Sequence, residues 1–200
     1  MTDDTNKALI QKHGFKAFFN TMMHQVIAPY EGEKSDPEKD IILEHVVGDR
    51  VLELGCGPKK LLETSVGVDI APKGTVINEL DGRVSQADVV GDVTKPLSFD
   101  DESFDTIIAS HVLEHCLDTV ETLELWERYL KPGGRLIIAV PDEEVTNGIP
   151  MNPEHCHAFT QESLENIGAL LGYRKLASMT TGNGISFVIV FEKEPEVAYA

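Results

Sequence analysis

The sequence predicts an α/β fold with one mostly parallel sheet and helices on both faces. Apolar runs of strand length alternate with segments of helical period, the pattern of strands joined by crossover helices. Residues 51–57, Val-Leu-Glu-Leu-Gly-Cys-Gly, end one such run in an acid and a glycine turn, which lets a ligand approach the backbone. Residues 181–184, Thr-Gly-Asn-Gly, have hairpin turn chemistry, so the last strand should run antiparallel to its neighbour.

The expected elements follow in order along the chain. Strands are expected at residues 50–54, 65–69, 85–90, 104–109, 135–140, 173–179 and 185–192. Helices are expected at residues 59–63, 74–80, 111–115, 118–130 and 161–171. The segment at 59–63 is very short, and the segment at 74–80 has the weakest helical pattern. No internal repeat or low-complexity tract interrupts this order.

Two further helices are expected before the first strand. Residues 5–28 carry large apolar side chains at spacings of three and four: Phe15, Phe18, Phe19, Met22, Met23 and Val26. Asp36-Pro37 offers an N-cap and a first-turn proline for a helix to about residue 47. We therefore expect an N-terminal helical segment at 1–47, a domain at 48–194 and a tail at 195–200. The N-terminal segment either docks on the domain or closes over its site as a lid.

Composition narrows the class of protein. The 200 residues are 42% hydrophobic and 26% charged, which suits one globular domain. No apolar run approaches the roughly 20 residues that span a bilayer, and the N-terminus lacks a secretory signal, so a cytoplasmic protein is expected. Cys56, Cys116 and Cys156 are odd in number and widely spaced, which favours free thiols. The net charge of −17 disfavours nucleic acid as a substrate.

The glycine turn is the first of five markers. Glu53, Gly55 and Gly57 alone are a weak signal, and the nicotinamide fingerprint would need a third glycine where Lys60 stands. The second marker is Asp69, which ends an apolar run, Val-Gly-Val, and is placed to accept hydrogen bonds from ribose hydroxyls. A plain surface turn is the alternative interpretation of Asp69.

The third marker is the segment at 87–93, Ala-Asp-Val-Val-Gly-Asp-Val. Asp92, just past the strand, can bind an adenine amino group while Val93 packs on the ring. A turn acid beside a glycine is an equally good interpretation. Asp88 suits the adenine role less well because it lies inside the apolar run.

The fourth and fifth markers complete a recognisable series. Residues 103–115 contain His-Val-Leu-Glu-His at 111–115, and residues 129–141 contain Leu-Lys-Pro-Gly-Gly at 130–134. With the five markers in order, residues 48–180 resemble the class I S-adenosylmethionine-dependent methyltransferases, most closely the broad small-molecule type called methyltransferase-11-like. The resemblance implies a Rossmann-like, seven-stranded sheet with an antiparallel last strand and the cofactor across the carboxyl ends of the strands.

The same resemblance assigns cofactor roles to individual residues. It implies S-adenosyl-L-methionine as cofactor, with its methionine part contacted by Glu53, Gly55, Cys56 and Gly57. The ribose would be contacted by Asp69 and Ile70, and the adenine by Asp92 and Val93. Ser110 and His111 would lie nearest the methyl group. The chain departs from the family at Lys59, where a third glycine often stands, and in the clipped helix that follows. This departure puts cofactor affinity in question.

Histidines supply the candidate acceptor-side groups. His111 is the first choice for a general base, because the strand end directs it at the methyl; capping or packing at a helix N-terminus is the alternative. His115 shares a helical face with His111, but no third ligand lies on that element, so no metal is expected. His155 and His157 either line the acceptor pocket or anchor their loop. Tyr30 would face the pocket if the N-terminal segment is a lid.

The predicted function is methyl transfer to a small-molecule acceptor, at oxygen before nitrogen. A non-catalytic module that binds S-adenosylmethionine or S-adenosylhomocysteine is the alternative, motivated by Lys59 and the clipped helix. A nicotinamide oxidoreductase is disfavoured by Lys60, which stands where its fingerprint needs a glycine. A nucleic-acid methyltransferase is disfavoured by the net negative charge of the chain. No nucleic-acid or membrane partner is expected, and a homodimer is left open.

Overall fold

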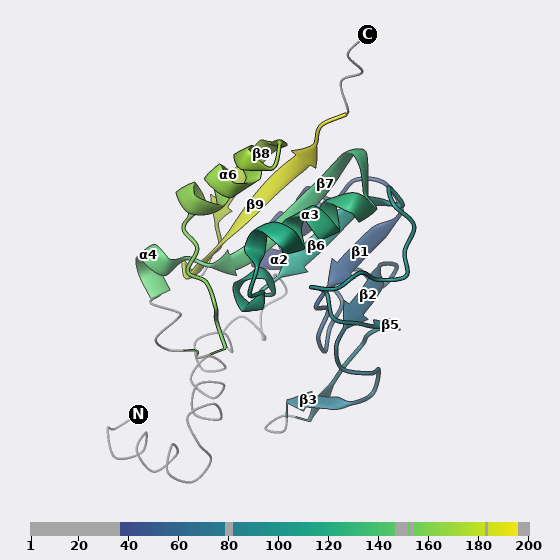
Figure 1. The fold of residues 1–200 in the computed structure, drawn as a ribbon. Helices are drawn as coiled ribbons and strands as arrows, with labels where there is room; N and C mark the ends of the chain where they lie inside the picture. The colour runs from purple at the N-terminus through teal and green to yellow at the C-terminus, as the bar shows by residue number, and fades with distance from the viewer. Residues whose placement is uncertain (1–36, 79–81, 147–151, 153, 183, 196–200) are drawn as a thin grey trace, which may run out of the picture.

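A computed structural model describes residues 37–78, 82–146, 152, 154–182 and 184–195. Its main sheet has seven strands in the order β5-β2-β1-β6-β7-β9-β8 (Figure 1). The strands are β1 (Val51–Leu54), β2 (Val66–Asp69), β5 (Val89–Val90), β6 (Phe104–Ser110), β7 (Leu130–Pro141), β8 (Tyr173–Thr180) and β9 (Ser186–Lys193). The strands from β5 to β7 pair in parallel, whereas β9 is antiparallel to both β7 and β8. The predicted α/β sheet with an antiparallel last strand is confirmed.

Helices cover the two faces of this sheet unequally. The described helices are α2 (Pro37–Glu44), the short 3-10 helix η1 (Leu113–His115), α3 (Thr119–Tyr129), α4 (Glu143–Thr146) and α6 (Gln161–Leu170). On one face, Trp126 of α3 and Leu164 of α6 join the larger apolar core. On the other, Ile42 of α2 packs with Ile108 and Ile137 in a smaller core. None of the helices in the described part of the chain is long and apolar enough to cross a membrane.

Alternating residues of the central strands supply both cores. Leu52 and Ile107 enter the core beneath α3 and α6, while Val51 and Ile108 enter the core beneath α2. Adjacent strand residues point to opposite faces, so a continuous apolar run is what a strand buried on both sides requires. The sheet is therefore held from both sides, and its carboxyl edge is left to present loops.

The predicted helix at 74–80 is wrong. Val76–Asn78 instead form strand β3, which pairs antiparallel with β4 (Arg83–Val84) in a separate two-stranded sheet. The run Thr75-Val76-Ile77 is β-branched throughout, and such side chains favour extended backbone over helix. Backbone bonds from Gly74 N to Ser85 O and from Ser85 N to Thr75 O extend the pairing.

The helix expected at 59–63 is also wrong, because this segment forms turns and bends. The Glu53 carboxylate accepts hydrogen bonds from the backbone N–H groups of Leu61 and Leu62, and these bonds fix the segment as a loop against the sheet. The strand expected at 85–90 shortens to Val89–Val90. Near the C-terminal half, β7 begins five residues earlier than expected, at Leu130.

Several predictions fall on residues that the structure does not describe. The helix at 5–28, Tyr30 and residues 196–200 lie outside the described ranges. The helix expected from Pro37 is present as α2, and it packs on the sheet rather than standing apart. The domain boundaries at 47/48 and 194/195 stay predictions.

Candidate functional site

The carboxyl ends of four parallel strands meet at one edge of the sheet. Leu54 of β1 lies beside Val68 of β2 and Ala109 of β6, and Asp69 lies beside Val90 of β5. The loops that follow these strands therefore leave the sheet at the same edge, as the arrowheads of β1, β2 and β6 in Figure 1 show. Every described residue that the sequence assigned to the cofactor lies at this edge or in these loops.

The two glycines after β1 are needed for different reasons. Gly55 has φ +64°, and a Cβ there would lie 2.3 Å from Cγ2 of Val112. Gly57 has φ +56°, but a Cβ there would meet no atom closer than the Gly55 carbonyl, at 3.9 Å. Both positions use the left-handed region that favours glycine. Only Gly55 is also closely packed, whereas the backbone at Gly57 is open.

Asp69 holds the glycine loop in place. Its Oδ2 accepts a hydrogen bond from Gly57 N at 2.9 Å, and its Oδ1 accepts one from Ala71 N at 2.9 Å. Each carboxylate oxygen keeps a lone pair for a further donor. The next residue, Ile70, is 75% exposed, so an apolar side chain stands open beside the acid.

Cys56 lies beneath this loop rather than above it. Its thiol is buried, and a Cβ built on Gly67 would approach its Sγ to 2.9 Å. Burial, together with the negative charges of Asp69 and Glu53, raises the pKa of Cys56 to about 11. The thiol is thus a neutral packing group at physiological pH.

The Glu53 side chain is engaged by the protein itself. Its carboxylate is 3% exposed and accepts hydrogen bonds from Leu61 N at 2.7 Å, Leu62 N at 2.8 Å and Ser65 Oγ at 2.6 Å. These bonds fasten the clipped segment that replaces a helix. Contact between Glu53 and the cofactor stays a prediction. In the structure, Glu53 stabilises the loop at 59–65 through these hydrogen bonds.

Lys60 fixes the same segment from the other side. Its ammonium group donates to Glu63 O at 3.1 Å, Ser65 O at 2.8 Å and Asp88 Oδ2 at 2.9 Å. Asp88 also accepts a bond from Gly67 N at 2.9 Å. Asp88 is therefore paired within the fold, in agreement with its lower rank as an adenine-binding group.

Asp92 and Val93 form the turn after β5. Asp92 Oδ1 accepts from Thr94 N at 2.9 Å and from Thr94 Oγ1 at 2.7 Å, and these bonds lower the pKa of Asp92. Val93 packs against the larger core, and its carbonyl accepts a bond from Trp126 Nε1 at 2.9 Å. The turn is well fixed, and the Asp92 side chain remains exposed.

His111 follows β6 in a strained backbone conformation. Its φ is +55°, and among the described residues only Glu102 is another non-glycine residue with positive φ. Its Nε2 lies 3.2 Å from Glu38 Oε1, and its Nδ1 lies 3.5 Å from Glu114 Oε1. The imidazole therefore stands between two carboxylates, a setting that the sequence analysis did not foresee.

Glu38 of α2 gathers the polar groups at this end of the sheet. Besides His111, it accepts hydrogen bonds from Ser110 Oγ at 3.0 Å and Ser186 Oγ at 2.8 Å. Burial alone would raise the pKa of Glu38, but the charge of His111 and these hydrogen bonds lower it to about 2. No local pattern marks Glu38 in the sequence, because its partners lie on β6 and β9.

The same pairing fixes the charge of His111. Burial would lower the pKa of His111, but the two carboxylates raise it well above the usual 6.5. A protonated imidazole has no lone pair with which to accept a proton. In this conformation both ring nitrogens face carboxylates, so a base role for His111 requires one of the two pairs to open.

Of the three other candidate histidines, two lie together although they come from different segments. His115 Nδ1 lies 3.1 Å from the Glu154 carbonyl, and the rings of His115 and His155 stack edge to face with centroids 4.8 Å apart. Burial lowers the pKa of His155. His157 turns away from this pair, and its Nε2 bonds to Leu117 O at 3.0 Å. The structure thus brings His115 and His155 together but sends His157 elsewhere.

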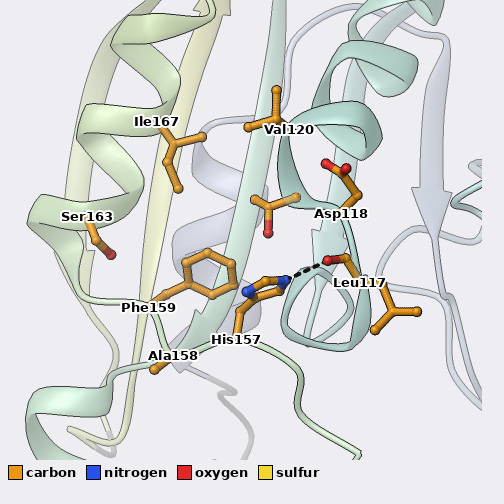
Figure 2. Close-up of a pocket in the computed structure, with 9 residues that line it drawn as sticks. Leu117, Asp118, Val120, His157, Ala158, Phe159, Ser163 and Ile167 are labelled. Atoms are coloured by element: carbon orange, nitrogen blue, oxygen red, sulfur yellow. Dashed lines mark hydrogen bonds between the residues drawn. The ribbon is translucent and has the colours of Figure 1, made fainter.

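His157 instead borders a shallow hollow between the start of α3 and helix α6 (Figure 2). The hollow has a volume of about 420 Å³. Val120, Phe159 and Ile167 give it an apolar lining, and Figure 2 shows His157 turned toward Leu117 at its border. Of the residues predicted from sequence to contact cofactor or acceptor, His157 is the one that lines this hollow.

A family profile described as a methyltransferase domain matches residues 25–178. The chain belongs to this methyltransferase-domain family. Membership implies S-adenosylmethionine as the methyl donor and confirms the resemblance that the five sequence markers carry. The family's open α/β sheet is the one described above.

Individual relatives of the family agree with this placement. A demethylmenaquinone methyltransferase of a Mycobacterium species is 39% identical over 101 residues, which are 46% of this chain and 41% of the relative. A ubiquinone biosynthesis O-methyltransferase of Xanthomonas oryzae is 31% identical over 104 residues, which are 47% of this chain and 44% of the relative. The chain therefore spans less than half the length of these two curated relatives.

Solved structures resemble the chain in fold. One is a Thermotoga maritima methyltransferase described as S-adenosylmethionine-dependent and as a possible histamine N-methyltransferase. It superposes with a TM-score of 0.62 at 20% identity, over 79% of this chain and 88% of that protein. At this identity the likeness concerns the fold alone.

Proposed function

We propose that this chain catalyses methyl transfer from S-adenosylmethionine to a small-molecule acceptor, with oxygen as the first choice of acceptor atom and nitrogen as the alternative. The observation that carries the proposal is the convergence of the loops after β1, β2, β5 and β6 at one edge of the sheet. In open α/β sheets this edge is where ligands bind.

The residues at this edge fit the methyl donor. The open backbone at Gly57 leaves room for a ligand to approach, and Asp69 keeps free lone pairs for two ribose hydroxyls. Ile70 and Val93 offer apolar surface to a flat ring, with Asp92 as an acceptor for an amino group. The backbone of residues 55–57 would hold the amino-acid end, while Glu53 keeps that loop rigid.

The acceptor side follows β6. When bound, S-adenosylmethionine supplies a methyl group that its sulfonium already activates, so the protein mainly has to align the acceptor. Alignment alone can lower a barrier by roughly 7–11 kcal/mol. The proposal assigns Ser110 and His111, at the end of β6, to the side of the methyl group, with His115, His155 and His157 on the adjoining segments as acceptor contacts.

His111 is proposed as the nearest protein base for a hydroxyl acceptor. A positioned base adds about 10²–10⁴-fold to the rate. The pair with Glu38 opposes this role. His111 would act as a base only once Glu38 or Glu114 has moved from its ring nitrogen and the imidazolium has released that proton to water. Acceptors that are already ionised need no base, and for them His111 would serve as a cationic contact.

A small acceptor is favoured over a nucleic acid by charge. The chain carries 34 acidic against 17 basic residues, and a phosphate backbone would be repelled by such a surface. The two curated relatives described above are named for quinone-related methylation, which supports a hydroxylated ring as the first acceptor class to try.

Cofactor binding and turnover should be measured together. Calorimetry with S-adenosylmethionine and S-adenosylhomocysteine comes first, followed by S-adenosylhomocysteine release with panels of phenols, catechols, carboxylic acids and amines. We expect Asp69→Asn to weaken cofactor binding about tenfold or more. Asp101→Asn is the matched control, because Asp101 pairs with Arg128 before the start of β6, away from this edge.

His111→Ala should lower turnover at saturating acceptor while leaving cofactor affinity within a few-fold of the parent chain. Full turnover of this variant from about pH 6 to 9 would remove the base role. Failure of the parent chain to bind either ligand would remove the proposed function itself.

A second function is favoured by one observation. Lys59 stands where the family often has a third glycine, and no helix follows the loop, so the chain could bind the cofactor without transferring its methyl group. Tight cofactor binding with no transfer to any acceptor class would support this binding module.

A further inference from the structure

Glu114 is a buried carboxylate without a hydrogen bond among the described residues. It is 1% exposed, and neither Oε1 nor Oε2 has a hydrogen-bond partner. Its nearest cationic contact is His111 Nδ1, at 3.5 Å from Oε1. A buried carboxylate normally costs several kcal/mol unless hydrogen bonds or an opposite charge compensate it. The second oxygen, Oε2, therefore needs an explanation.

Two imidazoles lie beside this carboxylate. One ligand atom each from Glu114, His115 and His155 can be chosen so that all lie within 4.8 Å of one another. His155 Nδ1 is itself buried and lacks a hydrogen-bond partner among the described residues. His115 Nδ1 faces the Glu154 carbonyl, which leaves His115 Nε2 as the nitrogen with a lone pair.

Backbone bonds build the cluster from two distant segments. The Glu114 carbonyl accepts hydrogen bonds from Cys156 N at 2.7 Å and His157 N at 3.3 Å. These bonds clamp the loop that carries His155 against η1. The Glu154 carbonyl also orients the His115 ring, as outer-shell acceptors orient histidines in metal sites. The juxtaposition is thus fixed by the fold.

We propose that Glu114, His115 and His155 bind a divalent first-row transition ion of the Zn²⁺ type. Two imidazoles and one carboxylate form the donor set of open zinc sites, which keep a position for water or substrate. Mg²⁺ and Ca²⁺ prefer oxygen ligands and suit this set less well. A bound ion would give both buried Glu114 oxygens a positive partner. Bonds of about 2.0–2.2 Å require the ligand atoms to draw closer by small rotations.

This site could not be inferred from spacing within one element. The sequence places His111 and His115 on one helical face, and it offers no third ligand there. In the structure, the groups that lie near His115 are Glu114, rather than His111, and His155, which comes from a loop 40 residues further along the chain. The proposal does not depend on methyl transfer, since it rests on the donor set alone.

The test is metal binding by the full, untagged chain after removal of bound metal. Calorimetry with Zn²⁺, and Co²⁺ absorption as a probe of the ligands, should give one site per chain. We expect Glu114→Gln and His155→Ala each to weaken Zn²⁺ binding about a hundredfold. His157→Ala is the matched control, because His157 shares the loop but bonds to Leu117 instead, and it should stay within about twofold.

Two further readouts keep the result clear. Cys156→Ala should leave the Co²⁺ spectrum unchanged, because the exposed thiol of Cys156 is not part of the site. Circular dichroism and the melting temperature show whether each variant has kept its fold. The proposal is overturned if Zn²⁺ does not bind, if binding survives both ligand substitutions, or if Cys156→Ala or His157→Ala abolishes it.

Discussion

The carboxyl edge of the sheet has two parts, the proposed cofactor edge after β1, β2 and β5 and the proposed acceptor edge after β6, and hydrogen bonds to carboxylates differ in range between them. At the cofactor edge, Glu53 bonds to a residue eight positions away and Asp69 to one twelve positions away. At the acceptor edge, Ser110 meets Glu38 across 72 positions, and Ser186 meets Glu38 across 148. The bonds of Glu53 and Asp69 thus join near neighbours in sequence, whereas those of Glu38 join distant segments. Longer contacts, such as that from Gly67 N to Asp88 Oδ2 across 21 positions, also stabilise the cofactor edge.

On the proposed function, this difference would separate the residues that bind the cofactor from those that select an acceptor. Glycine conformations and an acid after a strand are local properties, so a short motif is enough to specify them. The protonation of His111 depends on Glu38 of α2. The backbone hydrogen bonds of Glu114 depend on residues of the loop at 154–157. Changes at the two edges should therefore have different consequences.

The largest loss of stability is expected for Gly55→Ala. Its new Cβ would lie 2.3 Å from Val112 Cγ2, at a backbone with φ +64°. Overpacking and left-handed strain together should cost about 3 kcal/mol of unfolding free energy. Urea unfolding followed by Trp126 fluorescence measures this loss, because Trp126 is fully buried.

Gly57→Ala is the matched control for that experiment. It has the same kind of backbone, φ +56°, but open space around the new Cβ, so only the strain of about 1 kcal/mol applies. Its effect should instead fall on S-adenosylmethionine affinity, since the methyl would stand where a ligand approaches. Equal losses of stability in the two variants would contradict the distinction drawn between the two glycines.

At the acceptor edge, Glu38→Gln should cost less and should depend on pH. The charge of Glu38, 17% exposed, is paired with His111, 45% exposed, so about 1–2 kcal/mol is expected near neutral pH. The folded pKa of Glu38 is about 2 against an ordinary 4.5. The contribution is therefore fully present from pH 4.5 up to the pH at which His111 begins to lose its proton, and it is lost as the pH falls through about 2.

Melting temperatures of the parent chain and Glu38→Gln, measured from neutral pH down to pH 3, test this prediction. The gap between the two should narrow below about pH 4.5, because the unfolded parent chain takes up a proton at Glu38 there while the folded chain does not until about pH 2. Asp101→Asn serves as a control, because its pair with Arg128 is exposed on both sides and should contribute little. A gap that stays constant with pH would show that Glu38 acts through shape and not charge.

Much of the fold could be predicted because its signals are local. The buried strands read as apolar runs, and the Thr-Gly-Asn-Gly turn correctly indicated the antiparallel last strand. The errors came where a contact from outside the segment, or a local preference for extended backbone, decides the conformation. A loop forms at 59–63 in place of the expected helix, because the Glu53 carboxylate accepts hydrogen bonds from backbone N–H groups of this segment. Glu53 lies outside the segment, so the residue pattern within 59–63 does not reveal these bonds.

The site residues also differ in how far the sequence could predict them. The positions of Asp69, Asp92 and Ser110 at one edge follow from strand order, which the sequence predicts. The roles of Glu38 and Glu114 do not, because a lone glutamate in a short helix has no signature of its own. Sequence reasoning placed His111 correctly after a strand but could not supply the carboxylates that control its charge.

The smallest expected effect concerns the family's missing glycine. Lys59 is exposed, and it is not among the described non-glycine residues with positive φ, so its backbone does not require glycine. Lys59→Gly should then cost only about 0.5 kcal/mol, through the greater freedom of the unfolded chain. Cofactor affinity, measured by calorimetry, should change less than about threefold.

Lys60→Met is the contrasting substitution for the Lys59 experiment. Lys60 donates three hydrogen bonds that hold the same segment, so its loss should weaken cofactor binding more than the change at Lys59 does. If Lys59→Gly instead tightened cofactor binding tenfold, the departure at position 59 would be a real defect of the cofactor edge. A short local motif would then no longer suffice to bind the cofactor well.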